Sequence, residues 1–373
     1  MVKKLIKLSV LLVIFGGLFL LWQRLSGNPK GLVPLPYSLP SASETLILDA
    51  PLLIAGDRVG ARFGLFKEGL ALGLSTGLSK PIKIQSIAKE GEGLHRTLYR
   101  LQSLQKWPQV LIYHGGSEEF SESKFLTSQV RKIQRNFERY NNDRILTAMM
   151  LWPFLARLVY IPIKRMQLEA SPAPAAKQPL TDVEYQQRLE IIYRLFEIEL
   201  NQLVAMAREH NTLLILTTTP VNLDIVPRKT CSNAGSVAIA KELKVIREFI
   251  RKQDYKSAYT RSKALKDSSI ANAEILFLHG QVAFRNGLRS EAVEALKLAA
   301  AYDCIGWRAN EVTNSIIRKV AREHRVTLFD FAAVTEKDWN SNVTFFDEIY
   351  PQDLYYERAT EYLATVLKRI LKL

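Results

Sequence analysis

Short apolar runs alternate with longer amphipathic stretches over most of this chain. The runs occupy residues 52–55, 82–88, 110–113, 213–218 and 326–331, and each is closed by glycine, proline or a polar turn. Stretches with helical periodicity lie between them, for example residues 94–105 and 185–210. Strands that alternate with helices pair in parallel, with helices on both faces of the sheet. The alternation therefore predicts a three-layer α/β fold.

The length and composition leave room for further parts. The chain has 373 residues, of which 47% are hydrophobic, so we expect two to three structural units and exclude a disordered or collagen-like chain. The two cysteines and five histidines form no Cys-x-x-Cys or His-x-x-x-His pair. We therefore expect no metal site and no cofactor.

The N-terminal segment predicts a membrane anchor. Residues 5–22 form an apolar run that contains one lysine and is just long enough to span a bilayer. Lys3, Lys4 and Lys7 place the basic flank on the N-terminal side, which favours a cytoplasmic tip. A cleaved signal peptide is the alternative, but no small-x-small cleavage site or lipidation cysteine follows the run. We expect residues 1–26 to be an uncleaved single-pass anchor in a bacterial inner membrane, with a periplasmic body.

The segments that follow the predicted strands carry the candidate site. Gly56, Asp57 and Arg58 follow the first run, and Gly91 follows the second. Residues 114–120 follow the third run, and residues 346–351 precede the last predicted helix. Ligands of parallel α/β sheets bind beyond the carboxyl ends of the strands. Ordinary turns also use glycine, so each segment alone is weak evidence, whereas their order is more specific.

In that order, the segments resemble the SGNH (GDSL-like) hydrolase family, including its membrane-anchored periplasmic members. The resemblance covers about residues 46–125 and 205–370, and it implies an SGNH/flavodoxin-like parallel sheet. Family members carry a serine nucleophile after the first strand and an oxyanion-hole glycine after the second. An oxyanion-hole asparagine follows the third strand, and an Asp-x-x-His pair before the last helix supplies the orienting acid and the base.

Carried over residue by residue, the family pattern is degenerate here. Five positions match the family pattern: Gly56, Asp57, Gly91, Gly115 and Asp347. At the departing positions, Arg58 replaces the nucleophile and Tyr350 replaces the base. After the third strand, Ser117 replaces the asparagine and Glu118 stands at the position of the following acid. Arginine cannot act as a nucleophile, and tyrosine is a poor base at neutral pH. The sequence therefore predicts that no intact catalytic site remains.

Two interpretations of the altered site stay open. Arg58 is expected to face Asp347, Glu118 or Glu119, either in an ion pair that fills the old pocket or in an anion or sugar site with His114. A shifted catalytic pair of His114 and Ser117 is a further alternative. It requires two side chains on one tight turn to point at each other.

A helical insertion is expected at residues 229–324. Ala258 and Ala292 are 34 residues apart, and Gly280, Ala292 and Ala299 follow the small-residue spacing of tetratricopeptide repeats, which this segment resembles. A generic helical hairpin is the alternative. Cys231 and Cys304 bracket the insertion, and in an oxidising compartment they are disulfide candidates; two buried free thiols are the alternative.

A second insertion, at residues 124–179, is basic and apolar. Nine basic and two acidic residues fall within residues 124–165, which gives half of the net charge of +14. Trp152, Phe154 and Tyr160 suit a membrane interface, although a helical flap over the body is an equal alternative. The prolines at 153 and 162 argue against a second membrane span.

These observations predict five regions: an anchor (1–26), a proline-rich linker (27–43), an α/β body (44–228 and 325–373) and the two insertions. We expect a non-catalytic, membrane-anchored protein that binds an envelope polymer or serves as an accessory subunit of an inner-membrane complex. The resemblance implies partners such as the O-acyltransferases that modify cell-surface polysaccharides, and anionic lipid or polysaccharide accounts for the basic charge. No nucleic-acid module is visible. An esterase or acyltransferase with an atypical site is the alternative function.

Overall fold

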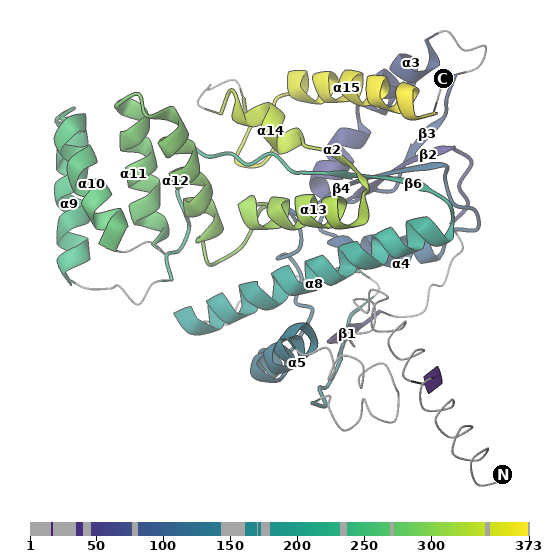
Figure 1. Ribbon diagram of the computed structural model, residues 1–373, viewed down its shortest axis with the longest axis horizontal. Coiled ribbons are helices and arrows are strands. Elements are labelled where there is room, and N and C mark those ends of the chain that lie inside the picture. Colours follow the sequence, from purple (N-terminus) through teal and green to yellow (C-terminus); the bar gives the residue numbers. More distant parts are fainter. Residues whose placement is uncertain are drawn as a thin grey trace, which may run out of the picture. The chain divides into compact units, whose positions relative to one another are not determined.

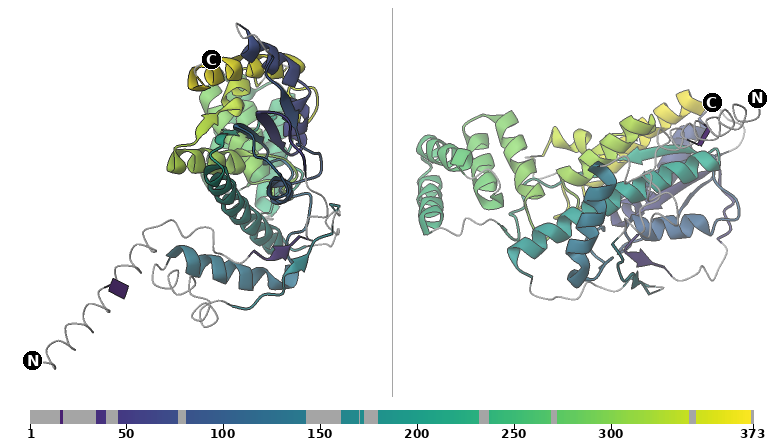
Figure 2. Two further views of the ribbon diagram at one scale, coloured as in Figure 1. Left: turned by 90° about the vertical axis from the view of Figure 1, so that its right-hand side faces the viewer. Right: turned by 60° about the horizontal axis from the view of Figure 1, so that its bottom comes forward.

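The computed structural model describes residues 16–17, 35–39, 46–76, 81–142, 161–169, 171–172, 180–231, 237–268, 272–339 and 344–371 (Figures 1 and 2). These residues fall into two compact units, one comprising residues 1–40 and 124–168 and the other residues 41–123 and 169–373. The larger unit holds the sheet and the helical insertion. The described part of the chain contains no helix long and apolar enough to cross a membrane. Apart from Gly16 and Gly17, the run at residues 5–22 lies outside the described residues.

The larger unit is built on a five-stranded parallel sheet. The strands are β2 (Leu52–Gly56), β3 (Ile84–Ser86), β4 (Val110–His114), β6 (Leu213–Thr217) and β7 (Thr327–Phe329), in the spatial order β3-β2-β4-β6-β7. Each of the five predicted apolar runs corresponds to one strand. The strand order is that of flavodoxin-like sheets: β3 lies on one side of β2, and β4, β6 and β7 follow in turn on the other side. The predicted α/β class is confirmed.

Alternation along the strands divides the core into two layers (Figure 1). Leu53, Leu111 and Leu214 point to one face, which is covered by α4 (Leu94–Gln102), α8 (Asp182–Glu209) and α13 (Glu311–His324). Ile54, Ile112 and Ile215 point to the other face, which is covered by α2 (Arg58–Gly64), α3 (Lys67–Ser75) and α15 (Asp353–Leu371). The short α14 (Phe331–Glu336) follows β7 and packs on this second face through Phe331 and Val334. Asp330 caps the helix by accepting the Ala333 N–H.

The insertion after β6 consists of four helices. They are α9 (Val237–Arg251), α10 (Tyr255–Ser268), α11 (Ala273–Arg285) and α12 (Arg289–Ala301), arranged as two hairpins in sequence order (Figure 1). Gly280 lies where α11 and α12 touch, since a Cβ atom there would be 2.6 Å from Cγ of Leu296. Ala292 and Ala299 are buried in the same cluster. The predicted small residues therefore permit close helix packing.

The smaller unit contains part of the basic insertion. Its elements are η2 (Thr127–Gln129), α5 (Val130–Asn142) and a two-stranded parallel pair, β1 (Tyr37–Ser38) with β5 (Met166–Gln167). The Asn136 side chain donates to the Ile161 carbonyl and accepts the Ile161 N–H, both at 2.9 Å. The end of the expected linker thus pairs with the insertion instead of forming a plain spacer. Trp152, Phe154 and Tyr160 lie outside the described residues.

Candidate functional site

The Asp57 carboxylate connects two segments at the edge of the sheet where the strands end. Asp57 follows β2 and caps α2 by accepting the Val59 N–H at 3.0 Å. Its second oxygen accepts the backbone N–H groups of Ser117, at 2.6 Å, and Glu118, at 3.0 Å. One side chain therefore holds the turn after β4 against the start of α2.

Burial raises the pKa of Asp57 to about 7, and the negative charges of Glu118 and Glu119 add to the rise. The hydrogen bonds from Ser117 and Val59 act in the opposite direction. Asp57 therefore titrates near neutral pH although it accepts three backbone N–H groups.

Arg58 forms an ion pair with Glu118. Arg58 is the first residue of α2, and its Nε donates to Oε1 of Glu118. The Glu118 side chain is 1% exposed, whereas that of Arg58 is 21% exposed. The same Glu118 oxygen lies 3.4 Å from the Gly91 amide, which donates to it. The structure thus brings Arg58, Gly91 and Glu118 together, and an ion pair stands at the position that the resemblance assigns to the nucleophile.

Tyr350 stands beside this pair with a protonated phenol. Burial raises the pKa of Tyr350 to about 12, with Glu90 adding to the rise and Arg58 opposing it. The hydrogen bonds of Asp347 go to the backbone instead. Its Oδ1 accepts the N–H groups of Ile349 and Tyr350, both at 2.7 Å, in a local turn. At neutral pH the phenol therefore keeps its proton and is unsuited to the role of a base.

The alternative pairing of His114 with Ser117 is not formed. His114 is fully buried on the α2–α15 face of the sheet, with edge-to-face contacts to Phe63 and Phe331. Neither His114 nitrogen nor Oγ of Ser117 has a hydrogen-bond partner among the described residues. Burial lowers the pKa of His114 to about 3, so the imidazole is neutral. His114 is enclosed in the core and does not join Arg58 and Glu118 in an open anion site.

A second buried cluster was not indicated by the sequence. His95, Glu119 and Glu199 present ligand-type atoms within 4.8 Å of one another, and all three are buried. Each has structural partners: for example, Glu119 accepts the Leu94 N–H at 2.8 Å, and His95 Nε2 lies 2.8 Å from Oε2 of Glu122. Residues 95, 119 and 199 belong to three separate segments, so no spacing pattern marks them. We assign the cluster a structural role.

Arg96 completes this buried network. Its guanidinium donates to both oxygens of Glu122, at 2.7 and 2.5 Å, and both side chains are 4% exposed. Hydrogen bonds from Arg96 and His95 overcome the effect of burial and lower the pKa of Glu122 to about 2. The network ties α4 to the segment after β4, the same segment that supplies Glu118.

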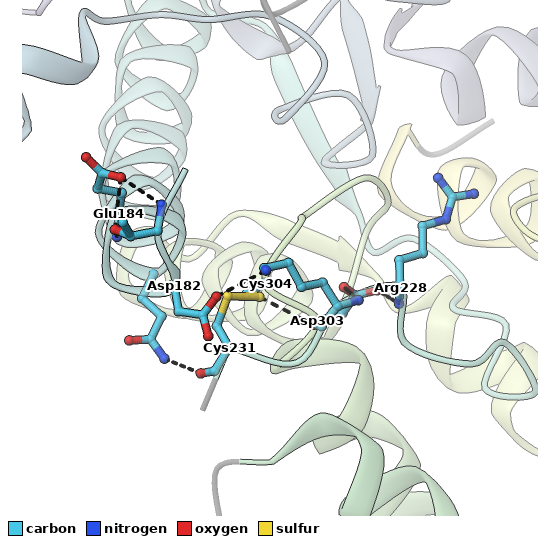
Figure 3. Close-up of a disulfide and its surroundings, with 9 residues drawn as sticks. Asp182, Glu184, Arg228, Cys231, Asp303 and Cys304 are labelled. Atoms are coloured by element: carbon cyan, nitrogen blue, oxygen red, sulfur yellow. Dashed lines mark hydrogen bonds and ion pairs between the residues drawn. A yellow bond between two sulfur atoms is a disulfide. The ribbon is translucent and has the colours of Figure 1, made fainter. Parts of the chain in front are cut away.

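A disulfide closes the base of the helical insertion (Figure 3). The sulfur atoms of Cys231 and Cys304 are 2.17 Å apart, and the Cα atoms are 5.8 Å apart. Asp303 accepts the N–H groups of Arg228 and Lys229, at 2.9 and 3.2 Å, and Lys229 forms an ion pair with Asp182 at the start of α8. The bridge is therefore embedded in contacts between the insertion and the body.

Comparisons with known proteins find only distant similarity. No protein-family model and no curated protein sequence matches the chain. Among solved structures, the crystal structure of the lipase/acylhydrolase from Enterococcus faecalis matches with a TM-score of 0.34 and 8% sequence identity. The match covers 85% of this chain and 94% of that chain. With so low a TM-score and identity, we draw neither a family nor an activity from this match.

Proposed function

We propose that this chain is a non-catalytic SGNH-like protein that is anchored in a bacterial inner membrane and serves there as a binding or accessory subunit. The observation that carries the proposal is the ion pair between Arg58 and Glu118. It occupies the position at which the resemblance requires a serine nucleophile. A guanidinium remains charged at all physiological pH values and cannot attack a carbonyl carbon.

The other catalytic positions support the same proposal. A general base must accept a proton near neutral pH, whereas the pKa of Tyr350 is raised to about 12. The Gly91 N–H, which the resemblance assigns to the oxyanion hole, donates to Glu118 at 3.4 Å, and Ser117 stands where the resemblance requires an asparagine. An oxyanion beside Gly91 would therefore meet the Glu118 carboxylate instead of a free donor.

Two observations support the proposed location. The apolar run at residues 5–22, with its basic N-terminal flank, favours an anchor with the body outside the cytoplasm. The Cys231–Cys304 bridge suits an oxidising compartment such as the periplasm. The expected partners are an inner-membrane complex, such as one that contains an O-acyltransferase, and anionic lipid or envelope polysaccharide. The 124–165 segment, with Trp152, Phe154 and Tyr160, is the proposed membrane contact.

The test measures two properties of the same full-length preparation: its reactivity with a serine-directed probe and acyl esters, and its association with membrane proteins. Protein extracted from membranes should not react with a fluorophosphonate probe and should not hydrolyse short acyl esters above the buffer rate. A Glu118→Gln variant should also remain unlabelled, since no nucleophile is uncovered. Cross-linking before extraction should capture membrane-protein partners.

Turnover that survives Ser117→Ala but is lost in Asp347→Ala would contradict the proposal and favour the alternative, an esterase or acyltransferase with an atypical site. Recovery of a shortened, soluble protein would contradict the anchor. A reporter fused after Leu373 should be active only in a periplasmic format.

A further inference from the structure

Three buried side chains with ligand-type atoms converge on the α4–α8 side of the sheet. His95 lies on α4, Glu199 lies on α8, and Glu119 lies in the segment after β4. Their nitrogen and carboxylate oxygen atoms lie within 4.8 Å of one another, and none of the three residues is more than 2% exposed. We call these three residues the His95 cluster. Two carboxylates this close together in the core favour a nearby cation or a shared proton, because each disfavours the charge of the other.

A fourth side chain, that of Tyr113, points to the same place. Tyr113 lies on β4, two residues after Leu111, so its side chain is on the same side of the sheet as α4 and α8, and it is fully buried. Its hydroxyl has no hydrogen-bond partner within the described part of the chain. Burial raises the pKa of this phenol well above its usual value, and the negative charges of Glu119, Asp57 and Glu199 add to the rise. Buried tyrosine hydroxyls usually have a partner, so this hydroxyl is an independent sign of a ligand at the cluster.

Two glycines leave room for this convergence. A Cβ atom at Gly93 would lie 3.1 Å from Nδ1 of His95 and 3.1 and 3.2 Å from the two carboxylate oxygens of Glu119. Nδ1 and the carboxylate therefore face the same small space beside Gly93. A Cβ atom at Gly115 would collide with the Tyr113 hydroxyl. A side chain at either position would displace an atom of the cluster or the hydroxyl beside it.

Glu122 orients the imidazole of the cluster. Nε2 of His95 lies 2.8 Å from Oε2 of Glu122, and Glu122 is ionised because hydrogen bonds from Arg96 and His95 overcome the effect of burial and lower its pKa to about 2. An ionised carboxylate only accepts hydrogen bonds, so Nε2 carries a proton. In the neutral imidazole the lone pair is then on Nδ1, the atom beside Gly93 and Glu119. A carboxylate that holds the outer nitrogen of a histidine is the usual support of a metal-binding imidazole.

From these observations we infer that the His95 cluster binds a zinc ion through Nδ1 of His95 and one carboxylate oxygen each of Glu119 and Glu199. The Tyr113 hydroxyl stands at the fourth position. An imidazole nitrogen combined with carboxylate oxygens suits zinc, whereas calcium and magnesium take oxygen ligands. Zinc–ligand distances of about 2.0–2.2 Å place the atoms of a tetrahedral set roughly 3.5 Å apart, so the cluster contracts by about 1 Å on binding. The burial of all four side chains is typical of a structural ion.

The ion would join α4, α8 and the segment after β4, which also supplies Glu118. Its ligands come from three separate segments, so the spacing of histidines and cysteines, on which the expectation of no metal site depends, does not reveal them. The inference goes beyond the proposed function, and the two fail separately. Labelling by a fluorophosphonate probe would overturn the non-catalytic assignment and leave the zinc site unaffected. Absence of zinc binding would leave the Arg58–Glu118 pair and its consequences unchanged.

The experiment titrates Zn²⁺ into full-length protein that has been stripped with a chelator and held in neutral nanodiscs. We expect one tightly bound ion per chain, a higher thermal transition, and visible absorption bands when Co²⁺ takes the place of zinc. The Glu199→Gln variant should weaken zinc binding by more than about 100-fold, since loss of an outer contact alone costs roughly 10–100-fold. The matched control Glu291→Gln alters another carboxylate that contacts a buried imidazole, that of His279 at 2.9 Å, and should bind zinc like the parent protein.

A second pair of variants keeps the test independent of folding defects. Tyr113→Phe should shift the cobalt bands, whereas Tyr356→Phe, which removes another buried hydroxyl without a hydrogen-bond partner in the described chain, should leave them unchanged. Failure of the parent protein to bind zinc would overturn the inference and leave the two acids to protons or to cations of the protein. Equal zinc affinity in the parent and Glu199→Gln, or equal weakening in Glu199→Gln and Glu291→Gln, would also overturn it. So would cobalt bands that Tyr113→Phe does not alter.

Discussion

A Cβ atom at Gly56 would lie 1.9 Å from the backbone carbonyl oxygen of His114. The two residues are partners in the β2–β4 register, and Gly56 has a φ of +143°, which side chains rarely permit. This close approach sits at the point where the strand order reverses. β2 ends at Gly56, and the side chain of the next residue, Asp57, accepts the Ser117 and Glu118 N–H groups that follow β4.

Replacing Gly56 with alanine should therefore cost about 3–5 kcal/mol of unfolding free energy, because backbone strain and a clash with main chain add together. Gly287→Ala is the matched control. Gly287 also has a positive φ, of +79°, but no described atom lies within 4 Å of the place that a Cβ atom would take. That variant should lose only about 1 kcal/mol. Urea denaturation measures the unfolding free energies of both variants. Equal losses of unfolding free energy in the two variants would show that the contact with His114 is unimportant.

Removing Arg58 should destabilise the protein, because Glu118 would remain as a buried, unpaired carboxylate. We expect Arg58→Ala to cost about 3 kcal/mol, at the lower end for buried pairs since Arg58 is partly exposed. The double variant Arg58→Met, Glu118→Leu should recover most of this loss. Chemical denaturation gives the unfolding free energies of the single and double variants. A double variant as unstable as Arg58→Ala would contradict a simple charge-pair role.

Asp57 should make stability fall as the pH rises. Its pKa is raised from 3.8 to about 7 in the folded protein, so between these values the folded state binds the proton more tightly than the unfolded state does. The contribution of Asp57 to the unfolding free energy is complete below about pH 4 and is lost as the pH rises through about 7. The total is on the order of 4 kcal/mol.

Unfolding free energies measured from about pH 4 to about pH 8 test this expectation. The Asp57→Asn variant should lack the decline, even if it is less stable overall. The control Asp49→Asn alters a fully exposed carboxyl whose pKa is lowered by Lys83, and it should retain the decline. An unchanged slope in Asp57→Asn would assign the pH dependence to other groups.

The Cys231–Cys304 bridge should stabilise the helical insertion. The bridge spans a sequence separation of 73 residues, and closing a loop of that length contributes about 4 kcal/mol in the chain-entropy description. Replacing both cysteines with alanine should lower the unfolding free energy by about that amount. Mass spectrometry of protein from an oxidising compartment, without reduction, should find the linked peptides. Free thiols there would contradict both the bridge and the proposed location.

The sheet was predictable because buried parallel strands are continuous apolar runs, which a plain hydrophobicity pattern reveals. The edge residues Asp57, Arg58, Gly91 and Glu118 were predictable as neighbours because the carboxyl ends of the strands converge. The partners of Asp57 were not, since the donors are backbone amides and carry no side-chain signature.

Two other features also lacked a sequence signal. The β1–β5 pair has two residues in each strand, which is too short for a periodic pattern. The surroundings of His114 depend on Phe331 of α14, which lies more than two hundred residues away in the sequence. Contacts of this kind arise from the packing of distant segments, and local propensity does not encode them.

The geometry at the base of the four-helix insertion has a consequence for how the chain tolerates change. The insertion leaves and re-enters the body at two Cα atoms 5.8 Å apart, which a tight turn can join. The body therefore needs only a short connection there, whatever the length of the excursion. The four helices form a cassette that recombination can remove, lengthen or replace, and a proteolytic nick within it leaves the two pieces covalently joined.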